Sequence, residues 1–143
     1  MNGHKTSYAD IAKKDLLAVK EMLRAGLYNH SARLCQQYVE KIFKTCIAQH
    51  SSDETDIALL HTHKLARLAE RCGALHKIVF SRLEMAFFRE LTDYYFDTNY
   101  PGDDYIELSE AEAIQTYDEV LRFQKLYEAT LCSKIILSED EAL

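Results

Sequence analysis

The chain has 143 residues, the size of one domain, and its 4 Gly and 1 Pro argue against a disordered, collagen-like or loop-rich β-sandwich protein. Its formal net charge is −6, from 17 basic and 23 acidic residues. We therefore do not expect it to coat nucleic acid or an anionic membrane through bulk charge, although this net charge does not exclude a local patch of basic residues. The sequence shows no signal-peptide core, no apolar run of ~20 residues and no zinc-type cysteine spacing. We therefore expect a cytoplasmic protein with free thiols and no cofactor.

Two helices are predicted in the first third of the chain. Apolar residues at three-to-four spacing predict a helix over Tyr8–Ala25, with Ser7 as N-cap and Gly26 just after its end. A second helix is predicted from about Tyr28 to Gln49. Because apolar residues cover more than one face of this helix, we expect it to be central and contacted on two sides.

The middle of the chain is predicted to contain a connection and two more helices. The polar, acidic segment Ser51–Leu60 is expected to be a connection. A short helix over His63–Cys72 would be capped by Thr62 and closed by Gly73. A long helix is then predicted over about Leu75–Asp97.

The last helix follows the one clear turn in the sequence. Pro and Gly within Asn99–Asp104 stop the preceding helix. Ser109–Glu112 has the pattern of a capping box, and the helix it starts is predicted to run to about Lys134.

These elements predict an all-α fold, an up-and-down antiparallel bundle of four main helices plus one short helix. No segment alternates with period two for long enough to indicate a strand, and short connections favour antiparallel neighbours. We expect one domain over residues 1–143, with its core at about 8–134 and an acidic, frayed tail at 138–143.

Three segments, in order, resemble the HEPN domain family. The first segment begins with a Gly-x-Tyr turn at residues 26–28, followed by Ala32. It continues with Gln-Gln-x-Val-Glu-Lys at residues 36–41 and ends with Lys44. Thr62–Leu65 resembles the family's Thr-His-x-Leu entry to a short helix. Asp97–Gly102 resembles its Arg-Tyr-Pro turn after the long helix, with Asn99 in place of the Arg. The resemblance spans about residues 8–134.

The resemblance implies a helical bundle, often a dimer. In bacteria and archaea such proteins are frequently encoded beside a minimal nucleotidyltransferase; some are ribonuclease toxins, and others are proposed to bind nucleotides. We interpret this chain as a non-catalytic HEPN-like interaction or regulatory module. It would form a homodimer and pair with a nucleotidyltransferase in a toxin–antitoxin-type or nucleotide-binding system. The alternative is a metal-independent endoribonuclease toxin acting as a homodimer on RNA.

Candidate binding residues form a polar ridge on the central helix, made of Gln37, Glu40, Lys41 and Lys44. This ridge is either a solvated stripe or helix-to-helix hydrogen-bond network, or a surface where the lysines meet phosphate and Gln37 meets a base or a partner. Other candidate binding residues are His63, Arg82, Arg89, Asn99 and Tyr100. Replacement of the family's Arg by Asn99 removes a cation that could contact phosphate there.

The catalytic members of the family share an Arg, four to six residues, then a His, which can stabilise charge and move a proton. Arg24 with His30, and Arg71 with His76, fit this spacing. Chance alone gives about one such match in this chain, and both pairs cross a predicted helix break. His61 and His63 lack a third ligand at metal-binding spacing. The sequence therefore favours a module without a catalytic or metal site.

Overall fold

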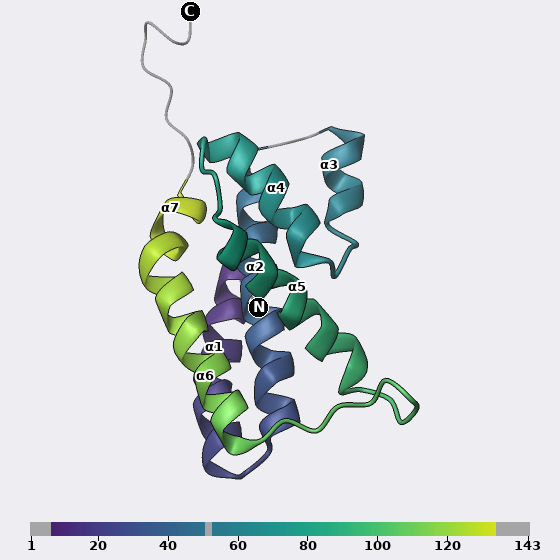
Figure 1. The fold of residues 1–143 in the computed structure, drawn as a ribbon. Helices are drawn as coiled ribbons and strands as arrows, with labels where there is room; N and C mark the ends of the chain where they lie inside the picture. Colours follow the sequence, from purple (N-terminus) through teal and green to yellow (C-terminus); the bar gives the residue numbers. More distant parts are fainter. Residues whose placement is uncertain (1–6, 51–52, 134–143) are drawn as a thin grey trace, which may run out of the picture.

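A computed structural model describes residues 7–50 and 53–133, and every regular element in these ranges is helical (Figure 1). The elements are α1 (Tyr8–Arg24), α2 (Tyr28–His50), α3 (Glu54–Leu59), α4 (Leu65–His76), α5 (Arg82–Asp97), α6 (Glu110–Phe123), the π-helical segment η1 (Gln124–Glu128) and α7 (Ala129–Leu131). The all-α bundle is therefore confirmed. The expected tail at 138–143 lies outside the described residues. No helix within those ranges is long and apolar enough to cross a bilayer.

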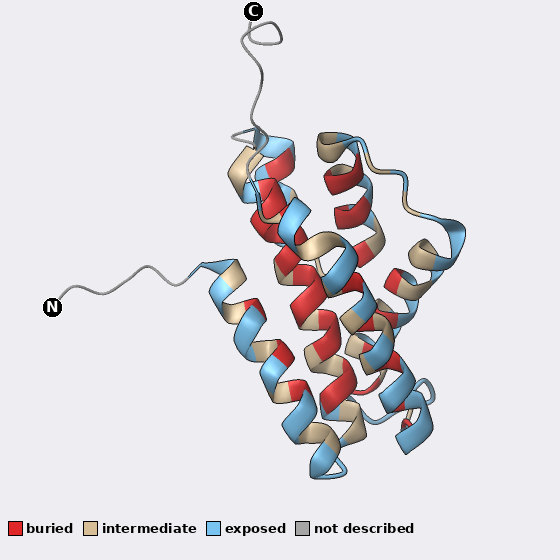
Figure 2. Ribbon diagram, turned by 90° about the vertical axis from the view of Figure 1, so that its left-hand side faces the viewer, coloured by how far each residue is buried: buried red, intermediate tan, exposed pale blue. Residues whose placement is uncertain are grey.

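Helix α2 is the central helix, as its apolar pattern predicts. It packs against α1 along its length and also against α4, α5 and α6, and buried residues lie on several of its faces (Figure 2). Phe43 of α2 is fully buried and makes edge-on ring contacts with Phe80, Phe88 and Phe123 at centroid distances of 5.2–6.0 Å. Edge-to-face pairs of this kind add to the stabilisation from burial alone.

Local capping signals place the starts of three main helices. Ser7, Ser81 and Ser109 each accept a hydrogen bond from the backbone N–H three residues later, and the acidic side chain there accepts one from the serine N–H. After α1, Gly26 has φ 74°, a backbone conformation that glycine adopts without strain. The predictions at Ser7, Gly26 and Ser109 are confirmed, whereas the cap at Ser81 was not predicted.

The predicted connection 51–60 contains a helix, so this prediction was wrong. Asp53 caps α3 by accepting a hydrogen bond from Thr55 N at 2.7 Å. Asp56 is buried in this six-residue helix, where Arg71 of α4 holds its carboxylate. Because isolated helices this short are unstable in water, the tertiary contact is what stabilises α3.

The predicted bounds of the short helix were also wrong. Helix α4 continues through Gly73 to His76, and Lys77 ends it with φ 57°. Gly73 is needed for a different reason: a Cβ there would lie 2.5 Å from the carbonyl oxygen of Ile78, because the chain folds back over the helix end. The long helix therefore begins at Arg82 rather than Leu75.

The start of α4 depends on another helix. Its N-cap is Lys64, which makes no capping hydrogen bond with its side chain, whereas Thr62 only accepts one from Lys64 N at 3.2 Å. The backbone N–H of Leu65 instead donates to Thr92 Oγ1 of α5 at 3.1 Å. The prediction of Thr62 as the helix cap was therefore wrong, and a side chain 27 residues away supplies the acceptor.

The last predicted helix is interrupted by the π-helical segment η1. Tyr127 in this segment hydrogen-bonds Glu84 of α5, and Glu128 accepts a hydrogen bond from Tyr38 of α2 at 3.0 Å. One π-helical turn rotates the following side chains relative to an ideal α-helix. The π-helical segment therefore makes contacts with α5 and α2, and the local sequence does not indicate these contacts.

Candidate functional site

Glu40 lies at the centre of a buried hydrogen-bond network on α2. Its Oε1 accepts hydrogen bonds from Gln36 Nε2 at 2.9 Å and from His63 Nδ1 at 2.8 Å, and its Oε2 accepts one from Lys44 Nζ at 3.0 Å. Helix α2 aligns Gln36, Glu40 and Lys44 because they are four residues apart. His63 reaches the network from the segment that leads into α4.

The network keeps Glu40 ionised although the side chain is only 9% exposed. Burial by itself would raise the pKa of the Glu40 carboxyl. Hydrogen bonds from Gln36, His63 and Lys44, together with the charge of Lys44, outweigh burial and hold this pKa below its ordinary value. Both carboxylate oxygens have donors, which is the condition under which a buried ion pair is tolerated.

His63 connects this network to the molecular surface. Its side chain is 44% exposed, and its ring stacks on Tyr95 at a centroid distance of 4.9 Å and meets the edge of Phe96 at 6.5 Å. Because a carboxylate only accepts hydrogen bonds, the Nδ1 that faces Glu40 carries a proton. The ring is therefore oriented by a buried carboxylate on one side and by aromatic rings of α5 on another.

The predicted polar ridge separates into an interior part and a part that faces α1. Glu40 and Lys44 are buried, whereas Lys41 Nζ pairs with Asp15 of α1 at 2.5 Å. Gln37 is half-buried on the same helix. This is the geometry of a helix-to-helix network, one of the two alternatives for the ridge. A phosphate group would have to displace Asp15 or Glu40 from a lysine.

The turn after α5 carries the remaining polar candidates. Asn99 donates a hydrogen bond back to the carbonyl oxygen of Tyr95, and Tyr100 is 73% exposed. Arg33 of α2 reaches this turn and donates to Thr98 O at 2.7 Å and to Thr98 Oγ1 at 3.1 Å. A cation is therefore present at the turn although Asn99 replaces the family's arginine. Arg82 and Arg89 are both exposed on α5.

The two Arg–His pairs are arranged differently from each other. Arg24 pairs with the exposed Glu21 at 3.1 Å, and His30 is exposed across the α1–α2 turn. Arg71 and His76 lie on one unbroken helix, which corrects the expected break at Gly73. Five residues of an α-helix rotate the side-chain direction by about 140°.

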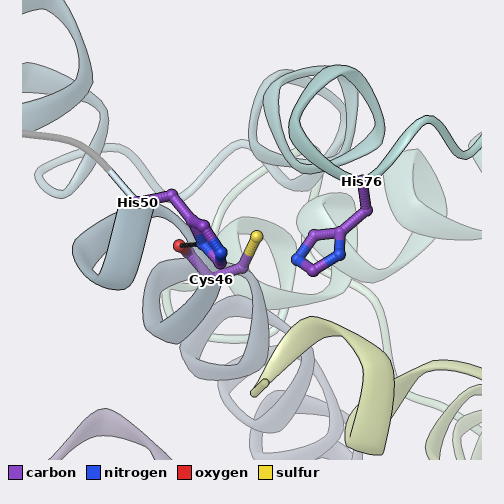
Figure 3. Close-up of side chains that lie close together, drawn as sticks. All are labelled: Cys46, His50 and His76. Carbon is purple, nitrogen blue, oxygen red and sulfur yellow. Dashed lines mark hydrogen bonds between the residues drawn. The ribbon is translucent and has the colours of Figure 1, made fainter. Parts of the chain in front are cut away.

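The side chains of that second pair accordingly engage different neighbours. Arg71 donates to both carboxylate oxygens of Asp56, with N–O distances of 2.8 and 2.9 Å. The ring of His76 lies against Cys46 and His50 at the end of α2 (Figure 3). Arg71 therefore links α3 to α4 and does not meet His76 at a common point.

An apolar groove lies between α5 and the α6–η1 segment. Leu83 and Leu126 line it and are 83% and 56% exposed, and Phe87 lines it as well. Acidic residues such as Glu90 and Glu119 also line this groove. Exposed apolar side chains that gather around a groove with polar residues are typical of protein interaction surfaces.

Several residues of these sites were missed from the sequence. Gln36 stands four residues before Glu40, so helical spacing could have indicated its hydrogen bond. Cys46 and His50 have the same spacing. Arg33 and Thr98 are 65 residues apart, and no local pattern indicates that they meet.

Comparison with known proteins gives one match. The model of the HEPN domain family matches residues 7–127, a range that runs from the N-cap of α1 into η1. Neither a curated protein nor a solved structure matches the chain. The matched range includes the Glu40 network, the entry to α4 and the turn after α5.

Proposed function

The chain belongs to the HEPN domain family, and from this premise we propose that it is a non-catalytic interaction or regulatory module. It acts in the cytoplasm as a homodimer and pairs with a minimal nucleotidyltransferase in a toxin–antitoxin-type or nucleotide-binding system. The family resemblance motivates the choice of partner, and the surface of this chain supports an interaction role.

The groove between α5 and the α6–η1 segment is the observation that carries the proposal. Leu83 and Leu126 expose most of their apolar surface there, and contact with a partner would remove it from water. Complete burial of one leucine contributes about 1.5–3 kcal/mol. A few such side chains around one groove are enough for a specific association when the partner fits them.

The roles of two candidate catalytic arginines support the choice of a non-catalytic module. The guanidinium of Arg71 is engaged by the buried Asp56, and that of Arg24 pairs with Glu21. Two charged residues of the family motif on α2, Glu40 and Lys44, pair with each other inside the bundle. Arg71, Glu40 and Lys44 thus have structural partners inside the bundle, and a reaction at them would require breaking those pairs.

The proposal is tested by the variant Leu83→Asp, with Leu17→Asp as matched control because Leu17 is 75% exposed on α1. Self-association is measured by light scattering, and pairing by co-purification with any nucleotidyltransferase encoded beside the gene. We expect Leu83→Asp to weaken association at least about tenfold, since a charge replaces a leucine that the partner would bury. Leu17→Asp should behave as wild type.

A wild-type protein that stays strictly monomeric at high concentration and does not co-purify with the nucleotidyltransferase would show that the proposal is wrong. Association that Leu83→Asp leaves intact would show that the groove does not carry it.

One observation favours the endoribonuclease alternative. His30 is exposed and lines a shallow hollow together with Tyr105 and Glu107, beside the turn that also exposes Arg24. A second copy could complete such a site. The test is incubation of a mixed RNA pool with purified protein in EDTA. Our proposal expects intact RNA, whereas cleavage that disappears in His30→Ala or His76→Ala would establish the alternative.

A further inference from the structure

Three side chains that can bind a metal ion converge where α2 and α4 end. Cys46 and His50 lie one turn apart at the C-terminal end of α2, and His76 is the last residue of α4. Figure 3 shows the two rings on either side of the cysteine sulfur. One ligand atom from each side chain lies within 4.8 Å of the other two. The histidine rings are 5.1 Å apart between centroids and nearly perpendicular, at 81°.

Two histidine nitrogens at the cluster have environments that are compatible with binding a metal ion. His50 Nδ1 lies 2.7 Å from the carbonyl oxygen of Cys46, and since a carbonyl only accepts, Nδ1 carries a proton. Such a hydrogen bond also orients the ring, as it does in established metal sites. His76 Nε2 is buried and has no hydrogen-bond partner among the described residues. A buried polar atom without a partner is costly, and a metal ion would satisfy it.

The electrostatic surroundings also favour a cation. Two α-helices end at the cluster, and their C-termini carry partial negative charge. Arg71, whose positive charge acts on Cys46, is itself paired with the carboxylate of Asp56.

We propose that Cys46, His50 and His76 bind one zinc ion per chain, with water as the fourth ligand. Zinc prefers thiolate sulfur and imidazole nitrogen in tetrahedral geometry, at about 2.3 and 2.0–2.1 Å. Those bond lengths place ligand atoms about 3.3–3.7 Å apart, so from a separation within 4.8 Å the side chains must close by no more than about 1.5 Å. Rotation of half-exposed histidines at helix ends can supply this movement. This proposal departs from the sequence-based expectation that the chain has no metal site.

The bound ion would clamp the end of α4 to the end of α2. Those helix ends come from segments 26 residues apart in sequence, between His50 and His76. A ligand that binds only the folded state stabilises it by mass action, so zinc should raise the melting temperature, by an amount that grows with the logarithm of its affinity. This role does not depend on the interaction function proposed above.

The first test is titration of the metal-free, reduced protein with Co²⁺ under nitrogen, followed by displacement with Zn²⁺. One thiolate and two imidazoles predict intense tetrahedral d–d absorption, a sulfur-to-cobalt charge-transfer band and saturation at one ion per chain. Weak octahedral absorption without a charge-transfer band would overturn the proposal.

The second test uses His50→Gln and His76→Gln, with His61→Gln as matched control because His61 is exposed elsewhere. Zinc binding is measured by calorimetry, and circular dichroism checks that each variant folds. We expect each cluster variant to bind zinc at least about tenfold more weakly. Removing a residue that only orients a metal ligand already lowers metal affinity about tenfold or more, and these variants remove a ligand itself. His61→Gln should bind as wild type. Equal affinity in all variants would overturn the proposal, as would failure of zinc to raise the wild-type melting temperature.

Discussion

Lys44 Nζ lies 3.0 Å from Glu40 Oε2, and both side chains are buried on the central helix. The pair therefore differs from an ordinary helical ion pair at the surface. Removing one partner of a buried ion pair leaves the other charge in a poorly solvated site, which costs far more than the pair contributes in water. The same carboxylate also anchors His63, so the pair links the interior to the surface near α5.

We expect Glu40→Gln to destabilise the protein by about 3–5 kcal/mol because it leaves the Lys44 charge buried without a carboxylate. The free energy of unfolding is measured by urea denaturation. The control is Glu21→Gln, which removes an exposed partner of Arg24 and should change stability by at most about 1 kcal/mol. Equal effects of the two changes would contradict the structural role of the buried pair.

The lowered pKa of Glu40 predicts a pH dependence with a definite sign. The folded state holds this carboxyl ionised below its ordinary pKa of 4.5, so its stabilisation is present above pH 4.5 and is lost as pH falls through the lower folded pKa. The difference in unfolding free energy between wild type and Glu40→Gln should therefore shrink below pH 4.5. The measurement is urea unfolding of both proteins at pH 7, 4.5 and 3.5.

Other acidic groups do not obscure that comparison. Hydrogen bonds with Ser7 lower the pKa of Asp10, and hydrogen bonds with Ser109 lower that of Glu112. Both carboxylates titrate equally in wild type and variant, so their contributions cancel in the difference. A difference that stays constant down to pH 3.5 would contradict the assignment to Glu40.

Asp56→Asn should detach α3 from α4. The change removes the charge from a bidentate pair with Arg71, and hydrogen bonds to charged groups contribute about 1.5–3 kcal/mol. Hydrogen exchange should show faster exchange of the α3 amides with little change in α2. Arg71→Lys is the matched variant: it keeps the positive charge but not the two-pronged geometry, and should give part of the same effect.

Lys77→Gly should stabilise the protein. Lys77 has φ 57°, a left-handed conformation that costs a non-glycine residue about 1 kcal/mol or more. Glycine removes this strain but loses some entropy on folding, so we expect a net gain of about 0.5–1 kcal/mol and a rise of about 2 °C in melting temperature. Lys77→Ala removes the same side chain but keeps the strained backbone. A rise in melting temperature with alanine as large as with glycine would contradict the explanation.

Local sequence determined much of the fold. The start of α1 at Ser7 and its end before Gly26 depend on capping within a few residues, and the apolar residues on several faces of α2 indicated its central position. The i, i+4 spacing of Glu40 and Lys44 likewise indicated that they could pair. These features are predictable because each depends on backbone geometry and neighbours within one or two helical turns.

Only the tertiary structure decided the rest. Helix α3 exists because Arg71 holds Asp56, α4 begins on a hydroxyl from α5, and its end past Gly73 depends on the chain that folds back over it. His76 likewise lies beside Cys46 and His50 only because α4 packs against α2. Spacing on one helix sets which side chains share a face, but burial and convergence arise between segments distant in sequence, where packing free energy decides the partners.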